Sequence, residues 1–495
     1  MALVLTNTLT QKKEVFNPLG DTVKIYVCGM TVQGAPHFGH LRAYITADVL
    51  IRYLQFLGYK TKVIQNFTDI DDKIIDKAIE EKTDYRIIAK RNIDEYFEVA
   101  DKMNIKRADF YPYATQHIQE IIELIQRLID RGFAYQSNNG DVYFAVEKFA
   151  DYGKLSKKRL DDLVAGARVE VREHKKNPAD FALWKASKPN EPWWQSPWGK
   201  GRPGWHIECS AMAMYHLGET IDIHLGGEDL IFPHHENEIA QSEAATGKPF
   251  VRYWIHNAML NLTGEKMSKS TKHFITAKEL LEKYSPNVLR LYFLKAHYRS
   301  PMEFDFEILD STKDSWLRIE EFLNQAEEEN AKENQDAVSD ETKNAFKEAM
   351  DDDLNTPKAV ALIFDTVKNG FNALQNNDKN TLSQEYTRLL FFLNNLGFNT
   401  EAKLRTRKII KQTISVTSSK ISKALSIAQN KNENDIVYLI EKGLKDNDYQ
   451  LIIIARELAR NKKLFDIADL IRDGIQELGY ILEDTDKGTR IKRKI

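Results

Sequence analysis

The two cysteines of the chain, Cys28 and Cys209, are the residues whose types and surroundings first suggest chemistry. Each lies in a patch rich in histidine, glycine and aromatic residues, "VKIYVCGMTVQGAPHFGH" and "WHIECSAMAMYHLG". Such cysteines can be buried packing, a disulfide, or thiolates that bind metal or react. The N-terminus "MALVLTNTLTQKK" lacks the basic start and the long apolar run of a secretory signal. We therefore expect a cytoplasmic protein in which the two thiols are metal-binding or catalytic.

A histidine–glutamate pair offers two more metal ligands. In "PHHENEIA", an expected helix places His234 and Glu238 four residues apart, on one face. His235 and Glu238 would fit as well, so the spacing leaves both histidines open. Together with Cys28 and Cys209, the set would contain two thiolates, an imidazole and a carboxylate, which suits zinc better than magnesium or calcium. The alternative is a surface helix with two unrelated cysteines, and spacing alone favours neither interpretation.

Two further motifs suit phosphate binding. "HFGH" places His37 and His40 at the start of an expected helix, where main-chain amides bind anions. "LTGEKMSKSTKHF" provides Lys266, Lys269 and Lys272 at three-residue spacing, and lysine is a mobile point charge suited to phosphates. Taken alone, the histidines are equally compatible with a helix cap and the lysines with a solvated loop.

Acidic side chains follow two expected strands. "NFTDIDDKI" contains Asp69, Asp71 and Asp72, which could bind magnesium or, as we favour, form an Asx-turn that caps the next helix. "DIHLGGEDL" ends a strand with two glycines and Asp229. Glycines at such a place allow a ligand to come close, and a carboxylate near a sugar hydroxyl is a common nucleotide-binding arrangement.

The elements that must position these motifs follow a βαβ pattern. A strand in 21–32, a helix in 41–58 and a second strand in 59–67 predict an α/β fold with a Rossmann-like parallel sheet. A further strand and helix are expected in 219–247, where the chain returns to the same sheet. The Pro- and Trp-rich segment 120–200, which contains a hairpin strand in "SNNGDVYFAVEKF", is interpreted as an insertion.

Composition and charge limit the remaining possibilities. Hydrophobic residues make up 42% and charged residues 29% of the chain, as in a globular protein with buried cores. No apolar run approaches the roughly 18 residues of a membrane-spanning helix. The net charge of −3 gives no global attraction for nucleic acid. A nucleic-acid partner would therefore bind local patches, for which the candidates are the basic stretch 403–423 and the tail "RIKRKI".

In this order, the motifs together resemble the class I aminoacyl-tRNA synthetases and, more narrowly, the cysteinyl-tRNA synthetases. "HFGH" stands where the family carries its HIGH tetrapeptide, and "KMSKS" at 266–270 matches the second class I motif. Further matching segments are "CGMTV", "NFTDIDDKI", "GWHIECSAM", "DIHLGGEDLIFPHHENEIAQSEA", "HYRSPMEF" and "MDDDLNTPKA". The resemblance covers at least residues 20–360 and, more weakly, the end of the chain.

The resemblance implies roles for individual residues. The implied zinc ligands, which recognise the substrate thiol through the metal and decide between the two histidines, are Cys28, Cys209, His234 and Glu238. The implied catalytic residues are His37, His40, Lys266 and Lys269. The implied ATP-binding residues are His37, Gly39, His40, Asp229 and Lys269. The implied lining of the amino-acid pocket is Gly29, Thr68 and Trp205.

The resemblance also implies an activity. L-cysteine would react with ATP, bound with magnesium, to give cysteinyl-adenylate, from which cysteine would pass to the 3' end of tRNA(Cys). The expected partners are thus tRNA(Cys), L-cysteine and ATP, without a membrane, and the chain is expected to be a monomer.

The implied architecture has five parts. These are a Rossmann-like catalytic domain in two halves (1–119 and 201–255), a connective insertion (120–200), a KMSKS-bearing stem-contact region (256–306), a helical bundle (307–400) and a small C-terminal anticodon-binding domain (401–495).

Three departures from the family and two rival functions accompany this interpretation. The family usually has Leu-Gly-Asn where Thr271-Lys272-His273 follows KMSKS, and a Trp in place of Ile491; the segment 409–446 is also longer than usual. One rival is a ligase that joins cysteine to an amino sugar through the same adenylate, which the roughly 100 residues after 400 disfavour. The other is a non-catalytic zinc-binding protein on the same fold, which the intact HFGH and KMSKS motifs disfavour.

Overall fold

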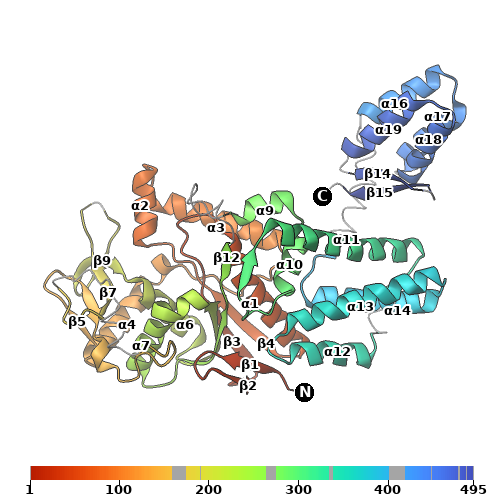
Figure 1. Ribbon diagram of the computed structural model, residues 1–495. Helices are drawn as coiled ribbons and strands as arrows, with labels where there is room; N and C mark the ends of the chain where they lie inside the picture. Colours follow the sequence, from red (N-terminus) through yellow and green to blue (C-terminus); the bar gives the residue numbers. More distant parts are fainter. Residues whose placement is uncertain are drawn as a thin grey trace. The chain divides into compact units, whose positions relative to one another are not determined.

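A four-stranded parallel sheet organises the larger part of the chain (Figure 1). Its strand order is β11–β10–β3–β4, with β3 at Thr22–Val27, β4 at Lys60–Gln65, β10 at Ile221–Gly227 and β11 at Val251–Asn257. Each pairing is parallel, as in a doubly wound α/β fold whose helices connect successive strands. The predicted α/β class with a Rossmann-like parallel sheet is therefore confirmed.

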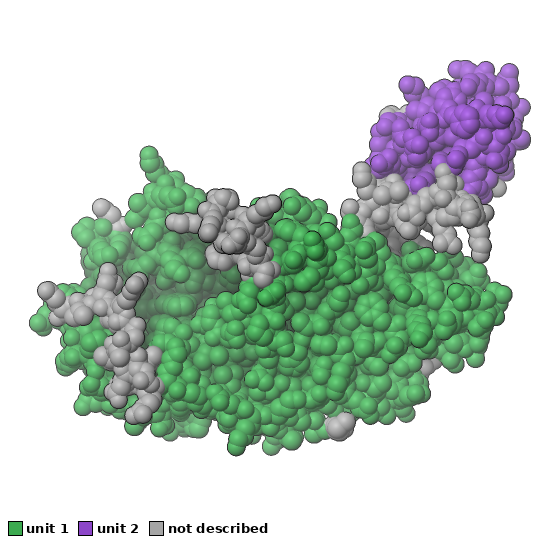
Figure 2. Space-filling view, in the orientation of Figure 1, with its two compact units in different colours: residues 1–398 green, residues 399–495 purple. Residues whose placement is uncertain are grey.

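The structure, a computed structural model, covers most of the chain. The described residues are 2–158, 174–189, 191–262, 275–333, 338–400, 419–446, 449–477, 480–485 and 488–493. The lysine motif with Lys266 and Lys269, the departure at 271–273, and 403–418 of the basic stretch lie outside them. The chain divides into two units, residues 1–398 and 399–495, which Figure 2 distinguishes by colour. None of the described helices combines the length and the apolarity needed to span a membrane.

Helix α1 (Phe38–Phe56) links β3 to β4 and carries the HFGH motif at its start. It begins three residues earlier than the apolar pattern predicted, because His37 caps it and forms a reciprocal capping box with His40. Leu41, Ile45 and Val49 are buried along it. The strand and the helix together fix where the HFGH turn lies.

The predicted insertion contains a sheet of its own, with strand order β5–β6–β7–β9–β8. Its strands, all paired antiparallel, are β5 (Ala134–Gln136), β6 (Val142–Phe144), β7 (Phe181–Ala186), β8 (Trp194–Ser196) and β9 (Gly199–Pro203). The predicted hairpin strand is confirmed as β6. An ion pair between Arg202 and Asp72 ties this sheet to α2 (Asp72–Glu80).

Helices make up the rest of the first unit (Figure 1). They are α3 (Tyr85–Lys102), α4 (Ile118–Asp130), α6 (Trp205–Leu217), α7 (Glu236–Thr246), α9 (Ala277–Lys283), α10 (Pro286–Leu294), α11 (Phe306–Glu328), α12 (Asp340–Met350), α13 (Thr356–Gln375) and α14 (Lys379–Asn395). Short strands accompany them, namely β1 (Val4–Asn7), β2 (Lys12–Val15), β12 (Leu260–Leu262) and β13 (Met302–Phe304). Ile25 of the sheet and Ile363 of α13 belong to one apolar core, so the bundle packs directly on the sheet domain.

The second unit has a separate core. It contains α16 (Ser419–Asn430), α17 (Asn434–Asp446), α18 (Tyr449–Asn461), α19 (Phe465–Glu477) and a hairpin of β14 (Tyr480–Thr485) and β15 (Gly488–Arg493). Ile421, Ile436 and Ile471 are buried in this core. The described part of the long segment 409–446 is therefore helical, and Ile491 lies in the hairpin opposite Leu482.

A buried ion pair joins α1 to the helices of the bundle. Arg290 Nη1 lies 2.7 Å from Asp48 Oδ2, and the two side chains are 1% and 0% exposed. Arg290 also donates to the main-chain oxygens of Leu396 and Met103, at 3.0 and 2.7 Å. Gly397 lies against this pair with φ +76, and a Cβ there would come within 2.5 Å of Arg290 Nη1. The position thus requires glycine for its conformation and for its lack of a side chain.

This arrangement predicts a large difference between two glycine substitutions. Gly58 also has a positive φ, +89, but a Cβ there would meet nothing within 4 Å. We expect Gly58→Ala to cost about 1–2 kcal/mol of unfolding free energy from conformation alone. Gly397→Ala should cost about 3 kcal/mol more, because it displaces the Asp48–Arg290 pair. Urea unfolding followed by tryptophan fluorescence measures this, since all seven tryptophans precede residue 399; equal losses would contradict the packing argument.

Candidate active site

Polar side chains converge where the parallel strands end. Cys28 directly follows β3, Asn66 directly follows β4, and Gly226 and Gly227 end β10. Ligands of open α/β sheets bind at the carboxyl ends of the strands. A Cβ on Gly226 would lie 2.7 Å from His235 Cε1, so the missing side chain lets the histidine approach the strand. The strand ends therefore form the floor of the candidate site.

Four buried residues bring possible metal ligands together. One ligand atom each from Cys28, His234, His235 and Glu238 lies within 4.8 Å of the others. The residues come from the end of β3, from the turn Ile231–His235 and from α7, where His234 and Glu238 share a face. Glu238 Oε1 is 3.0 Å from His234 Nε2 and 3.9 Å from His235 Nε2. The structure thus brings both candidate histidines to the cluster.

Cys209 reaches the same place from α6. Its side chain is buried, and its thiol adjoins Cys28 and His234. The neighbouring Cys28 thiol, followed by burial, raises the pKa of Cys209 well above its ordinary value. Two neutral thiols in this position would be poor ligands, whereas a bound cation favours the thiolate form.

The cluster contains ligand atoms that the described residues leave unsatisfied. His235 Nε2 is buried and has no hydrogen-bond partner within the described ranges, and the equally buried His234 Nε2 and Glu238 Oε1 face each other at 3.0 Å without further partners there. Each such atom costs about 1–3 kcal/mol when it stays unpaired. Because the three converge beside two thiols, a cation would satisfy them together. Sulfur, imidazole and carboxylate donors in one buried cluster fit zinc.

Buried histidines fix the orientation of these candidate ligands. His206 Nδ1 is 3.0 Å from His234 Nδ1, and His224 Nε2 is 2.9 Å from Glu238 Oε2. Burial opposes a charge on His234, but Cys209 and Glu238 raise its pKa to about 10. Burial likewise opposes a charge on Glu238, yet His224 and His234 lower its pKa to about 2. Hydrogen bonds of this kind set the tautomer and direction of metal ligands.

The HFGH turn presents two neutral imidazoles. The His37 and His40 rings stack with centroids 3.5 Å apart. His40 N–H donates to His37 Nδ1, and His37 N–H donates to His40 Nδ1, both at 3.3 Å. Because both Nδ1 atoms accept, each neutral ring carries its hydrogen on Nε2. Burial lowers the pKa of His37 to about 4 and, with the charge of His37, that of His40 to about 3.

The predicted amino-acid pocket residues border the metal-ligand cluster. Gly29 N–H donates to Asn66 Oδ1 at 2.8 Å, and a Cβ on Gly29 would overlap the Asn66 carbonyl. Thr68 is buried, and its N–H donates to Met30 O at 3.3 Å, which connects the ends of β3 and β4. The Trp205 ring, at the start of α6, stacks on His234 with centroids 4.5 Å apart.

The remaining predicted residues lie around this centre. Gly39 lies inside the HFGH turn, where its Cβ would come 3.1 Å from His37 Nδ1. Asp229 lies in the short helix Glu228–Leu230 after β10 and is exposed. The catalytic lysines, Lys266 and Lys269, are outside the described residues.

Known proteins are similar to this chain along its whole length. Residues 15–314 match the model of the "tRNA synthetases class I (C) catalytic domain", and residues 345–400 match the "DALR domain". A cysteine–tRNA ligase of Sulfurihydrogenibium sp. (strain YO3AOP1) is 46% identical over 503 residues, and one of Persephonella marina is 47% identical over 505 residues. Both alignments cover 100% of this chain and 100% of the relative. The chain belongs to the cysteine–tRNA ligase family.

Solved structures agree with this family at the level of the fold. A methionyl-tRNA synthetase of Mycobacterium tuberculosis, in complex with methionyl-adenylate, aligns with a TM-score of 0.51 at 14% identity, covering 92% of each chain. A putative arginyl-tRNA synthetase of Campylobacter jejuni aligns with a TM-score of 0.52 at 14% identity, covering 78% of this chain and 94% of the other. The class I synthetase fold predicted from the motifs is therefore confirmed.

The sequence predicted one feature of this ligase-family site and missed two others. Asp71 accepts from Lys73 N–H at 3.0 Å and caps α2, so the favoured Asx-cap interpretation is confirmed. His206 and Asn66 were not singled out from the sequence, although the density of histidine around Cys209 was a signal for the first. Asn66 gave no signal, because its role depends on the neighbouring strand.

The cluster predicts which of the two histidines is required for metal. We expect the purified protein to contain about one zinc per chain. Cys28→Ser and His234→Gln should each lose most of it, because they remove a ligand. His235→Gln is the matched control, and it should keep its zinc, since His235 Nε2 lies 3.9 Å from Glu238 Oε1, farther than the 3.0 Å of His234 Nε2. Emission spectrometry of folded proteins measures this, and loss of zinc in His235→Gln alone would reverse the assignment.

Proposed function

We propose that the chain catalyses cysteine–tRNA ligation in two steps at one site. A carboxylate oxygen of L-cysteine attacks the α-phosphorus of ATP, so that cysteinyl-adenylate forms and pyrophosphate leaves. A hydroxyl of the 3'-terminal adenosine of tRNA(Cys) then attacks the activated carbonyl, and AMP leaves. The observation that carries the proposal is the position of the metal-ligand cluster, since Cys28 and the HFGH turn share one connection between β3 and α1.

Thiol selection depends on the buried cluster. The proposed zinc ligands are Cys28, Cys209, His234 and Glu238. Three of them, Cys28, His234 and Glu238, belong to the buried cluster, and the Cys209 thiol adjoins Cys28 and His234. When bound, zinc favours a thiolate over a hydroxyl ligand and so distinguishes cysteine from serine. A pocket without such a ligand separates close analogues by only about 10- to 200-fold. Gly29, Thr68 and Trp205 border the cluster and would hold the rest of the amino acid.

The HFGH turn and the lysine motif would stabilise the negative charge of the ATP phosphates. The Nε2–H groups of His37 and His40, together with the first amides of α1, would donate to the phosphates of ATP. Because both pKa values lie well below 7, the imidazoles donate as neutral groups at neutral pH. Lys266 and Lys269 would add positive charge in the transition state, magnesium would accompany ATP, and Gly39 and Asp229 would contact the nucleotide.

The acceptor is proposed to be tRNA(Cys), bound in part by residues 399–495. Relatives named cysteine–tRNA ligase match the chain from end to end, which favours tRNA over an amino sugar as the acceptor. The net charge of −3 means that tRNA must contact local basic patches. We propose that the second unit binds the anticodon, and that the protein acts as a cytoplasmic monomer.

Two assays test this function directly. Cysteine-dependent exchange of pyrophosphate into ATP tests the first step, and charging of a tRNA transcript with labelled cysteine tests the second. Absence of exchange would leave the non-catalytic zinc protein as the explanation. Exchange without tRNA charging, but with ligation of cysteine to an amino sugar, would identify the rival ligase.

Substitution of one lysine tests the phosphate assignment. Lys269→Ala should lower kcat for pyrophosphate exchange about 100-fold and leave the KM for cysteine nearly unchanged, because the charge it meets develops in the transition state. Lys278→Ala is the matched control, since Lys278 is exposed and lies 3.6 Å from Glu98 in an ion pair. An unchanged exchange rate in Lys269→Ala would remove this lysine from the mechanism.

Truncation after Thr400 separates the two steps. The first unit has its own core, and Phe398, which stacks on Trp316 with centroids 5.0 Å apart, is retained. We expect pyrophosphate exchange to continue at a similar rate, because the sheet and both motifs remain. The KM for tRNA should rise at least about tenfold, since the phosphate contacts of the second unit are lost. A truncated protein that charges tRNA as well as the full chain would contradict the anticodon assignment.

A further inference from the structure

We infer that Arg42 is a positioning residue, whose guanidinium fixes the HFGH helix against the base of strands β12 and β13. The inference rests on the proposed function, because it assigns to Arg42 the position of the HFGH turn, which would meet ATP, relative to β12 and β13. Arg42 lies two residues after His40 on α1 and is 2% exposed. Neither its spacing nor its neighbours in the sequence distinguish it from a surface arginine.

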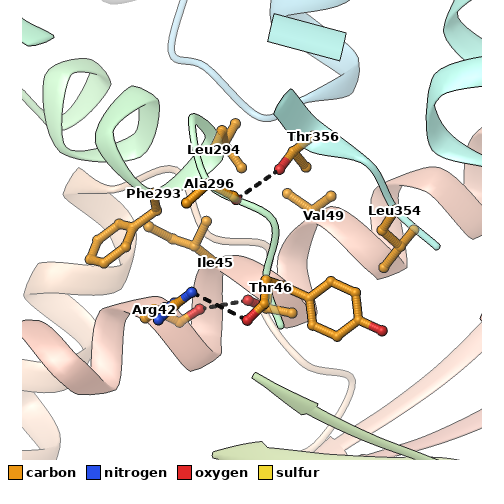
Figure 3. A pocket seen from close by; sticks show the side chains of 10 residues that line it. Arg42, Ile45, Thr46, Val49, Phe293, Leu294, Ala296, Leu354 and Thr356 are labelled. Carbon is orange, nitrogen blue, oxygen red and sulfur yellow. Dashed lines mark hydrogen bonds between the residues drawn. The ribbon is translucent and has the colours of Figure 1, made fainter. Parts of the chain in front are cut away.

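The guanidinium donates to four main-chain oxygens. Nη1 donates to Met259 O at 2.7 Å, and Nη2 lies 3.3 Å from both His297 O and Tyr298 O. Nη2 also donates to Ser300 O. Figure 3 shows Arg42 turned toward this segment, at the edge of a small pocket between α1 and the end of α10. Burial lowers the pKa of Arg42 to about 10, so the group stays charged at neutral pH.

The four oxygens lie at the start of a pair of strands. Met259 directly precedes β12, and Ser300 lies two residues before β13. The strands pair in parallel, with Leu260 opposite Met302, and Met302 N–H donates to Met259 O at 3.1 Å. One guanidinium therefore sets the position of both strand ends relative to α1. From β12 the chain continues toward Lys266 and Lys269.

The chain that follows the lysine motif is attached to the same turn of α1. Phe38 N–H donates to Ile275 O at 3.2 Å, and Ala277 N–H donates to Pro36 O at 2.8 Å. His37 and Thr276 form an antiparallel bridge. These are main-chain contacts, which no side-chain substitution removes. The attachment of the preceding strand, in contrast, uses the Arg42 side chain, so a substitution at 42 changes one attachment and leaves the other.

A purely structural role for Arg42 makes a different prediction from a positioning role. Arg290 is a matched buried arginine, because it is also held by carbonyl oxygens, those of Leu396 and Met103, but does not contact β12 or β13. If buried arginines only stabilise the unit, conservative changes at 42 and 290 should affect activity alike. If Arg42 positions the HFGH turn relative to β12 and β13, only its substitution should slow adenylate formation. Lysine keeps the charge but lacks the planar fork that reaches several oxygens.

The test compares Arg42→Lys with Arg290→Lys in cysteine-dependent pyrophosphate exchange. We expect both to lower the unfolding midpoint, measured by tryptophan fluorescence. Arg42→Lys should lower kcat about 10- to 100-fold, the effect of a misplacement of about 1 Å, with zinc content and the KM for cysteine within about twofold of the parent. Arg290→Lys should keep its kcat. Equal slowing in the two variants would overturn the inference.

A double-mutant cycle with Lys269→Ala separates this inference from the proposed function. If Arg42 and Lys269 act on the same step, the double variant should be little slower than Lys269→Ala alone. Fully multiplied losses would overturn the positioning role and leave the proposed function intact. Full activity in Lys269→Ala would overturn the lysine assignment and the inference with it.

Should Arg42→Lys fail to fold, Glu228→Ala replaces it. The exposed Glu228 carboxylate accepts a hydrogen bond from Met259 N–H at 2.8 Å, at the same strand end that Arg42 holds. We expect Glu228→Ala to lower kcat less than Arg42→Lys, with the same dependence on Lys269.

Discussion

The active site is built around buried ligand atoms that the protein does not satisfy by itself. Beside Cys28, His235 Nε2 has no hydrogen-bond partner among the described residues, and His234 Nε2 and Glu238 Oε1 face each other at 3.0 Å. Keeping such atoms buried opposes folding, since each loses its hydration. The surrounding structure must therefore hold them in place, and His206 and His224 do so by bonding the opposite sides of His234 and Glu238. The suitability of the cluster for a cation and the rigidity of the site have the same origin.

The parallel sheet brings this cluster and the HFGH turn into one connection. Cys28 directly follows β3 and His37 caps α1, so eight residues lie between the group that would select the thiol and the group that would meet the phosphates. Close approach of neighbouring strands is needed there, and Gly29 allows it because a side chain would overlap Asn66. A reaction that joins an amino acid to a nucleotide needs both substrates held close together, which a single connection favours.

Local sequence patterns predicted the sheet, α1, the capping of α2 by Asp71 and the hairpin strand β6, because each depends on neighbours in the chain. The spacing in "PHHENEIA" left His234 and His235 open, and the structure brings both to the cluster because each lies on the buried side of the turn before α7. The meeting of Cys28 with Cys209 was suggested by family resemblance alone, since α6 and β3 become neighbours only in the fold. Most of the insertion sheet was missed, because its strands are three to six residues long.

Arg42 and Arg290 could not be found from the sequence, because their partners are main-chain oxygens, which every residue carries. Arg290 satisfies the oxygens of Leu396 and Met103, which end α14 and α3, where helices leave such groups without partners. Arg42 does the same for the chain before β12 and β13. Apolar residues could fill these places with equal or greater stability, but they would not fix one element against another by hydrogen bonds of defined direction. Helix α1 is thereby held both near the HFGH turn and near Asp48, which makes it the element that relates this turn to the rest of the first unit.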